Sequence, residues 1–360
     1  MDHSPSQSRD VKFSADSNEA DEREVSRQTE ALRTYIVRVE SLMDTDELLK
    51  EFVNLFELSG ELEPSSNAGK TVEWLAARRV ICNTQKCSLC NGQCVLIMDD
   101  TDIDNLKWYC RACNRKQSIR EGSFFMLGND HSLFQLVSII YCFIKQLPHW
   151  AIAVEAELES REEAQAWCER LRSICVKWFS NHQHKLGEQS NELTPKIVEM
   201  GCSRCFEKAT DTSLTPKVHS PKNRVSQGPS ERLLFAVVEQ DSRKCHMINV
   251  TYWRNPKWTL GYLLHNKLIP GTKVVCDECC ASKRCSGINP CSFVHPDGLA
   301  SLRKCWLRFK RFCSIYPYNS SSGMNDYLKE FMWRNAFSHG NLFAQFLLCL
   351  REQYPATSEM

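Results

Sequence analysis

The sequence lacks the features of a secreted or membrane protein. Its opening residues contain no apolar run that could serve as a signal peptide, and no stretch of about 18 apolar residues could span a bilayer. It also has no excess of charge of either sign, because 45 basic residues nearly cancel 44 acidic ones. Bulk charge alone therefore does not indicate a nucleic-acid partner. We expect a nuclear or cytoplasmic protein without membrane contact.

Cysteine, in contrast, is abundant, with 20 residues. In a reducing compartment these are metal ligands or core residues rather than a disulfide framework. Cys87-Ser-Leu-Cys90 and Cys110-Arg-Ala-Cys113 form two C-x2-C knuckles, separated by 19 residues. This spacing predicts a tetrahedral zinc site with strands between the knuckles, and its four protein ligands make the zinc structural. Cys82 and Cys94 are alternative ligands, and a set of buried thiols without metal is the other reading.

Basic residues are grouped in two places along the chain. The first group adjoins the second knuckle and contains Arg111, Arg115, Lys116 and Arg120. The second group contains Arg303, Lys304, Arg308, Lys310 and Arg311. Such groups can contact phosphates, or they can be ordinary solvated surface charge. We expect the zinc ribbon to present the first group to DNA.

Composition and periodicity divide the chain into segments. They are a disordered acidic tail at 1–28, a helical region at 29–75, a zinc ribbon at 76–125, a second helical region at 126–190, a mixed-sheet domain at 191–352 and a tail at 353–360. Segments rich in β-branched residues at 196–200, 233–240, 246–253 and 273–277 predict strands of that sheet.

Apolar spacing predicts three helices in the second helical region, at 131–146, 148–158 and 161–181. Proline suits the start of the second helix, and Ser160 is a suitable cap for the third. The third helix carries Arg161, Arg170, Arg172 and Lys177. The pair of helices therefore resembles a helix-turn-helix that could read DNA, and ordinary packing is the alternative.

Five sequence blocks carry a resemblance to a known family. In chain order they are KQSIREGSFF at 116–125, KIVEMGCSRCF at 196–206, IPGTKVVCD at 269–277, FVHPDGLASLRKCWLRFK at 293–310 and NDYLKEFMWR at 325–334. They resemble the Merlin-type, insertion-sequence-like DDE transposases. The resemblance implies that the mixed-sheet domain is RNase H-like, the domain with which that family cuts and joins DNA using divalent metal. The expected fold class is thus a multidomain α+β or α/β protein with a zinc ribbon, a helical segment and an RNase H-like sheet.

The resemblance also implies three catalytic acids, of which this chain keeps one. Asp277 stands at the second position, whereas Gly201 and Arg303 occupy the other two. Two-metal phosphoryl transfer needs several carboxylates, and the fixed charge of an arginine would repel a cation and pair with Asp277. Glu199 is the alternative ligand, although on a strand it is displaced from Gly201 by roughly 6–7 Å. We expect no catalysis, and magnesium as a cofactor only if catalysis survives.

These features favour a transposase-derived nuclear protein that binds DNA or chromatin and acts as a scaffold in gene regulation or genome defence. Other nuclear proteins are expected partners, and a homo-oligomer stays open. One alternative is an active metal-dependent transposase, and another is a protein-interaction module without DNA binding. A second metal site formed by Cys202, Cys205, Cys279 and Cys280 also stays open.

Overall fold

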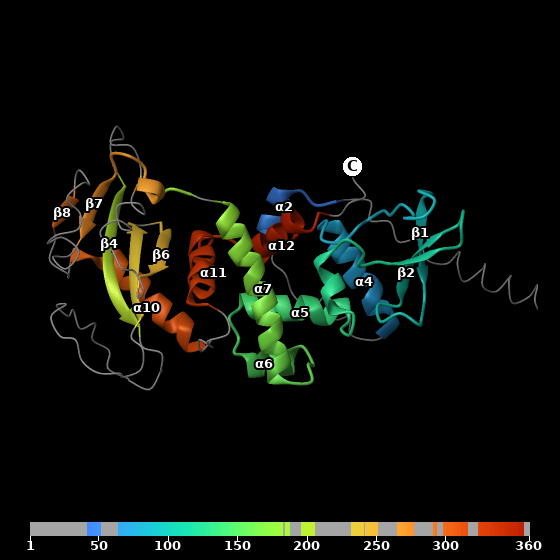
Figure 1. The fold of residues 1–360 in the computed structure, drawn as a ribbon. Coiled ribbons are helices and arrows are strands. Elements are labelled where there is room, and N and C mark those ends of the chain that lie inside the picture. The colour runs from blue at the N-terminus through green and yellow to red at the C-terminus, as the bar shows by residue number, and fades with distance from the viewer. Residues whose placement is uncertain are drawn as a thin grey trace, which may run out of the picture. The chain divides into compact units, whose positions relative to one another are not determined.

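Figure 1 shows the computed structural model of the chain. It describes residues 42–51, 64–182, 184–187, 196–205, 232–240, 242–250, 265–276, 291–293, 298–315 and 323–355. The predicted tail at 1–28 and Asp277 lie outside the described residues. Two compact units are present: a ribbon unit built mainly on Phe56–Leu133, and a sheet unit built on Met43–Leu55 and Phe134–Pro355. The six segments drawn from the sequence stay predictions. None of the described helices is both long enough and apolar enough to cross a membrane.

The ribbon unit contains helix α4 (Pro64–Ala77) and a small antiparallel sheet. Its strands β1 (Cys94–Met98), β2 (Leu106–Cys110) and β3 (Lys116–Ser118) pair in the order β1-β2-β3, and the short helix η1 (Phe124–Gly128) follows them. Alternation along the strands buries Leu96 and Trp108, as a half-buried sheet requires. The register pairs Cys94 with Cys110. The strands expected between the knuckles are therefore confirmed, and they place the start of β1 beside the second knuckle.

The sheet unit contains a mixed sheet of five strands in its described part. These are β4 (Ile197–Cys205), β5 (Arg232–Glu239), β6 (Cys245–Asn249), β7 (Lys273–Cys276) and β8 (Cys291–Phe293), in the order β6-β5-β4-β7-β8. The first three strands along the chain pair antiparallel, whereas β7 and β8 run parallel to β4. This order and these directions are those of an RNase H-like sheet. The predicted fold class is confirmed.

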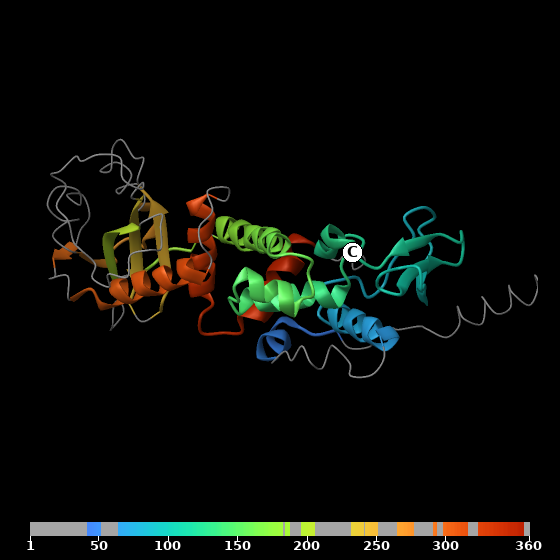
Figure 2. The ribbon, with the colours of Figure 1, turned by 90° about the horizontal axis from the view of Figure 1, so that it is seen from below.

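The two faces of this sheet are covered differently. On one face Val198, Met200, Phe235 and Val237 belong to a buried apolar cluster. On the other face α10 (Ala300–Ile315) packs against β4 and β5, as Figure 2 shows. Since neighbouring side chains of a strand point to opposite faces, Glu199 and Gly201 lie on the α10 side of β4.

Helices form the rest of the sheet unit. They are α2 (Thr45–Lys50), α5 (Leu133–Ile144), α6 (His149–Glu155), α7 (Arg161–Asn181), α11 (Met324–Ala336) and α12 (Leu342–Gln353). The three helices predicted for the second helical region are α5, α6 and α7, of which α5 and α6 are shorter than predicted. Ser160 caps α7 as predicted, because its hydroxyl accepts a hydrogen bond from the Glu163 backbone N–H at 3.1 Å.

A buried carboxylate joins three of these helices. Glu330 of α11 is fully buried and accepts hydrogen bonds from Nε of Arg172 at 2.7 Å and Nε of Arg334 at 2.8 Å. Arg334 also donates to the carbonyls of Phe143 and Ile144 at the end of α5. Arg172 therefore ties α7 to α11. Arg172 does not contact DNA from this helix, because the residue is only 2 % exposed and its guanidinium is paired with Glu330; the helix-turn-helix interpretation of α6 and α7 stays a prediction.

Replacing Glu330 with Gln should destabilise the sheet unit by about 3–5 kcal/mol, because two buried guanidinium groups would lose their counter-charge. Urea unfolding followed by circular dichroism measures the loss. Glu352→Gln is the control, since Glu352 pairs with His182 at 3.5 Å on the surface and should lose less than about 1 kcal/mol. Equal losses for the two variants would contradict the role given to Glu330.

Candidate metal centre and nucleic-acid interface

The two knuckles bring four thiol groups together in the ribbon unit. The sulfur of Cys87 lies 3.4 Å from that of Cys113, and the sulfur of Cys90 lies 3.3 Å from that of Cys110 and 3.5 Å from that of Cys113. All four sulfurs lie within 4.8 Å of one another. Bonds of about 2.3 Å in a tetrahedron around zinc require sulfur separations of roughly 3.8 Å, so a small outward movement fits the ion. The four cysteines can therefore hold a metal ion.

Each knuckle ends in an asparagine with a left-handed backbone. The φ angles of Asn91 and Asn114 are 58° and 59°. The Asn91 backbone N–H donates to the Cys87 carbonyl at 2.9 Å, and that of Asn114 donates to the Cys110 carbonyl at 2.8 Å. Asparagine adopts this conformation more readily than most residues. Both knuckles therefore have the sequence C-x2-C-N and the same turn. The sequence analysis missed these two asparagines, although their shared position after each knuckle is a visible signal.

Gly92 gives the sulfurs room. A Cβ at this position would lie 3.3 Å from the sulfur of Cys90 and 3.4 Å from that of Cys110, closer than most side chains tolerate. The backbone also prepares Cys87 as a ligand, because the N–H groups of Cys90 and Leu89 lower the pKa of its thiol to about 6. A depressed pKa favours the thiolate, which is the form that binds metal.

The two alternative cysteine ligands do not join this cluster. Burial raises the pKa of Cys94 to about 11, so its thiol keeps its proton, and its sulfur lies 3.7 Å from Oε1 of Gln117. Cys82 is buried and likewise stands outside the group. Among the residues that the structure describes, Cys87, Cys90, Cys110 and Cys113 are the group of His, Cys, Asp or Glu side chains suited to a metal ion.

The basic residues near the second knuckle differ in exposure and in ion pairing. Arg111 lies within the knuckle and Arg115 is the second residue after it, and both are exposed. Lys116 is about half exposed, and its Nζ lies 3.0 Å from a carboxylate oxygen of Asp99. Part of the charge of Lys116 is therefore neutralised within the protein. Arg111 and Arg115 are the stronger candidates for contact with a phosphate.

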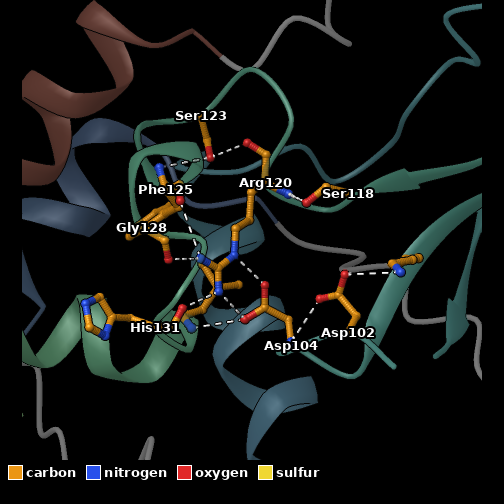
Figure 3. A network of polar contacts seen from close by, with 10 residues as sticks. Asp102, Asp104, Ser118, Arg120, Ser123, Phe125, Gly128 and His131 are labelled. Atoms are coloured by element: carbon orange, nitrogen blue, oxygen red, sulfur yellow. Dashed lines mark hydrogen bonds and ion pairs between the residues drawn. The ribbon is translucent and has the colours of Figure 1, made fainter. Parts of the chain in front are cut away.

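Arg120 has a structural role instead, as Figure 3 shows. Its guanidinium is 2 % exposed, forms an ion pair with Asp104 and donates to the carbonyls of Gly128 and His131, each at 2.6 Å. Asp104 also accepts the backbone N–H of Leu133 at 3.1 Å. The prediction that Arg120 contacts DNA is wrong, because every side of its guanidinium faces protein acceptors. It ties the β1–β2 loop to the segment that follows η1.

The sheet unit brings together β4 and the first turn of α10, which carry Gly201 and Arg303. The Leu302 backbone N–H donates to Oε2 of Glu199 at 2.7 Å, and the side-chain amide of Gln240 donates to Oε1 at 2.8 Å. Glu199 is 1 % exposed. It is the one acid in the sequence of β4, and both of its oxygens are occupied by hydrogen bonds. β4 and α10 together therefore supply one carboxylate to this face.

Two expectations about this face stay untested. Asp277 follows Cys276, the last described residue of β7, which pairs with Met200 of β4. The proposed second metal site also lies outside the described residues, because Cys279 and Cys280 are not described and neither is the side chain of Cys205.

Comparison with known proteins adds little to this assignment. No family model and no curated protein matches the chain. Among solved structures, the chain is similar to one described as "Mos1 transposase paired-end complex with left transposon end", with 10% sequence identity, 61% of this chain and 79% of that chain covered, and a TM-score of 0.24. The strand order and not this likeness carries the fold assignment. Fold and site together define an RNase H-like protein with a four-cysteine ribbon.

The purified protein should contain about one tightly held zinc ion per chain, because four thiolates at this spacing match the zinc geometry. Cys110→Ser should lose the ion and unfold the ribbon, since metal binding and folding are coupled in small metal sites. Elemental analysis and hydrogen exchange across 87–118 measure the two effects. Cys94→Ala should keep the ion. A wild-type protein that is metal-free and fully folded would contradict the assignment.

Proposed function

We propose that this protein is a nuclear DNA-binding scaffold derived from a Merlin-type transposase. The observation that carries the proposal is the four-cysteine cluster with Arg111 and Arg115 exposed at its second knuckle. A bound zinc ion would hold that knuckle rigid, so the two guanidinium groups would meet a phosphate backbone without first being ordered. Arginine also matches phosphate geometry with two parallel hydrogen bonds.

The ribbon contact is small and independent of sequence. Phosphate contacts fix the position of a protein on DNA and supply affinity, whereas sequence is read at base edges. Arg120 is buried and Lys116 is paired with Asp99, so two strong phosphate contacts are expected from this group and not four.

Replacing Arg111 and Arg115 together with Gln should weaken binding to duplex DNA. The slope of log affinity against log salt should become shallower by about 2, since each neutralised phosphate contributes roughly 0.9. Titration of labelled duplex at several salt concentrations measures the slope. Lys50→Gln with Lys70→Gln is the control, because it removes the same charge from exposed positions outside the ribbon. An unchanged slope in the arginine variant would favour the protein-interaction alternative.

We further infer that the RNase H-like unit does not cut DNA. Two of the three positions that hold acids in the transposase family are Gly201 and Arg303. The remaining candidate on β4, Glu199, is buried and hydrogen-bonded to α10 and to Gln240. Two-metal catalysis needs carboxylate oxygens that are free to bind the ions, and a nearby guanidinium opposes their charge. This arrangement supports a scaffold and not a nuclease.

The wild-type protein should therefore leave labelled duplex DNA uncut with either magnesium or manganese. Asp277→Asn should not change DNA affinity. Glu199→Gln should cost about 1–3 kcal/mol of stability, because a carboxylate with two buried donors becomes an amide with one acceptor oxygen. Gel analysis of the DNA and thermal unfolding measure these outcomes. Metal-dependent cleavage that is present in the wild type and lost in either variant would establish the active-transposase alternative.

The nuclear location and the role in gene regulation or genome defence belong to the same proposal. Fluorescence microscopy of the tagged protein tests the location, and sequencing of the DNA recovered with it from cross-linked chromatin tests the association. A protein that stays in the cytoplasm and recovers no chromatin would overturn this part of the proposal.

A further inference from the structure

Helix α10 carries charge of a single sign. Its sequence ASLRKCWLRFKRFCSI contains five basic residues and no acidic residue. Helix α7 mixes both signs with Glu162, Glu169 and Arg170, and α11 does so with Asp326 and Lys329. Mixed charge is the usual composition of a solvated surface, so α10 stands apart from its neighbours.

The basic residues of α10 gather on the side that faces away from the sheet. Leu302, Cys305, Phe309 and Phe312 are the buried residues of the helix. The exposed residues Arg303, Lys304, Leu307, Lys310 and Arg311 recur at helical spacing along one face. We name Arg303, Lys304, Lys310 and Arg311 the α10 basic face. At 1.5 Å per residue it is about 12 Å long, and that length of duplex axis holds roughly seven phosphate charges.

Local helix stability does not account for this charge pattern. Arg303 lies in the first turn, where the positive end of the helix dipole disfavours cations. Lys304 and Arg308 are four residues apart, and Arg308 and Arg311 are three apart, which are the spacings at which like charges repel each other. The pattern is unfavourable for the free helix and becomes favourable when an anionic surface covers the face.

The α10 basic face is also held in a fixed position. Glu199 of β4 accepts the Leu302 backbone N–H at 2.7 Å, which anchors the start of the helix. The aromatic rings of Phe309 and Phe331 pack edge to face with centroids 5.1 Å apart, which anchors its second half to α11. A rigid row of cations binds a regular row of phosphates at a lower entropic cost than flexible side chains on a loop would.

We propose that the α10 basic face binds the phosphate backbone of duplex DNA without sequence preference. It is a second DNA contact on the RNase H-like unit, and it lies on the face of the sheet where the transposase family would carry out catalysis. The inference extends the proposed DNA binding and does not depend on the ribbon contact. Four cations of fixed geometry match the charge of DNA, whereas an acidic protein partner would need four matching carboxylates.

The test uses the full chain with Lys304, Lys310 and Arg311 replaced together by Gln, which keeps helix propensity. Arg308 is half-buried and stays unchanged. The salt slope of binding to duplexes of several sequences should become shallower by about 3, equally for every sequence. Lys185→Gln, Lys244→Gln and Lys273→Gln together form the control, because they remove the same charge from exposed positions of the same unit outside α10. Circular dichroism confirms that each variant is folded.

A photo-crosslinking amino acid at position 307 gives a second readout, because Leu307 is 56 % exposed within the basic face. It should crosslink to duplex DNA, whereas the same group at Trp150, which is 64 % exposed on α6, should not. A triple variant that binds DNA like its control, or crosslinking no stronger at 307 than at 150, would overturn the inference even if an acidic protein binds the face.

The ribbon variant separates this inference from the proposed function. If the α10 variant changes the slope and the Arg111→Gln, Arg115→Gln variant does not, the α10 contact stands and the ribbon contact fails. The opposite result removes the α10 contact and leaves the ribbon contact. If neither variant changes the slope, both proposals fail.

Discussion

A buried carboxylate is stable only when donors surround it, and Glu199 meets this condition at the start of α10. Its oxygens accept the Leu302 backbone N–H and the Gln240 side chain, and its charge lies at the positive end of the helix dipole. This contact holds α10 on β4 and leaves the basic side of the helix outward. The same carboxylate is the one acid in the sequence of β4, so the side chain that anchors the helix is also the one that a metal ion on this strand would bind.

The sequence predicted the features whose cause is local. The C-x2-C spacing indicated the metal cluster, alternating β-branched residues indicated β4 to β7, and Ser160 marked the start of α7. The sequence could not show which arginines are exposed and which are buried in ion pairs, because the partners of the buried ones are distant in sequence. Arg120 is neutralised by Asp104, 16 residues earlier, and Arg172 by Glu330, 158 residues later. The strand order depends likewise on pairings such as β4 with β7, which no local pattern reports.

Near-zero net charge does not exclude a polyanionic partner when charges of opposite sign are separated in space. Several carboxylates form ion pairs within the protein. Asp104 pairs with Arg120, Glu330 pairs with two arginines, and Asp99 pairs with Lys116 and Lys107. Among the described residues, two groups of exposed cations lie at the second knuckle and along α10. The net charge counts buried and exposed charged side chains alike. Binding of DNA depends on the exposed ones.

The distance in sequence between Arg172 and Glu330 also affects the order in which parts of the nascent chain can fold. When α7 leaves the ribosome, the carboxylate that neutralises its buried guanidinium is still 158 residues away. At about 5–20 residues per second, that interval lasts roughly 8–30 s. During this time α7 can pack against α6, but its contacts with α11 cannot form. The ribbon unit has no such delay, because its fourth ligand, Cys113, follows Cys87 by 26 residues. The nascent chain therefore acquires its metal-binding ribbon well before the helices around Glu330 can close.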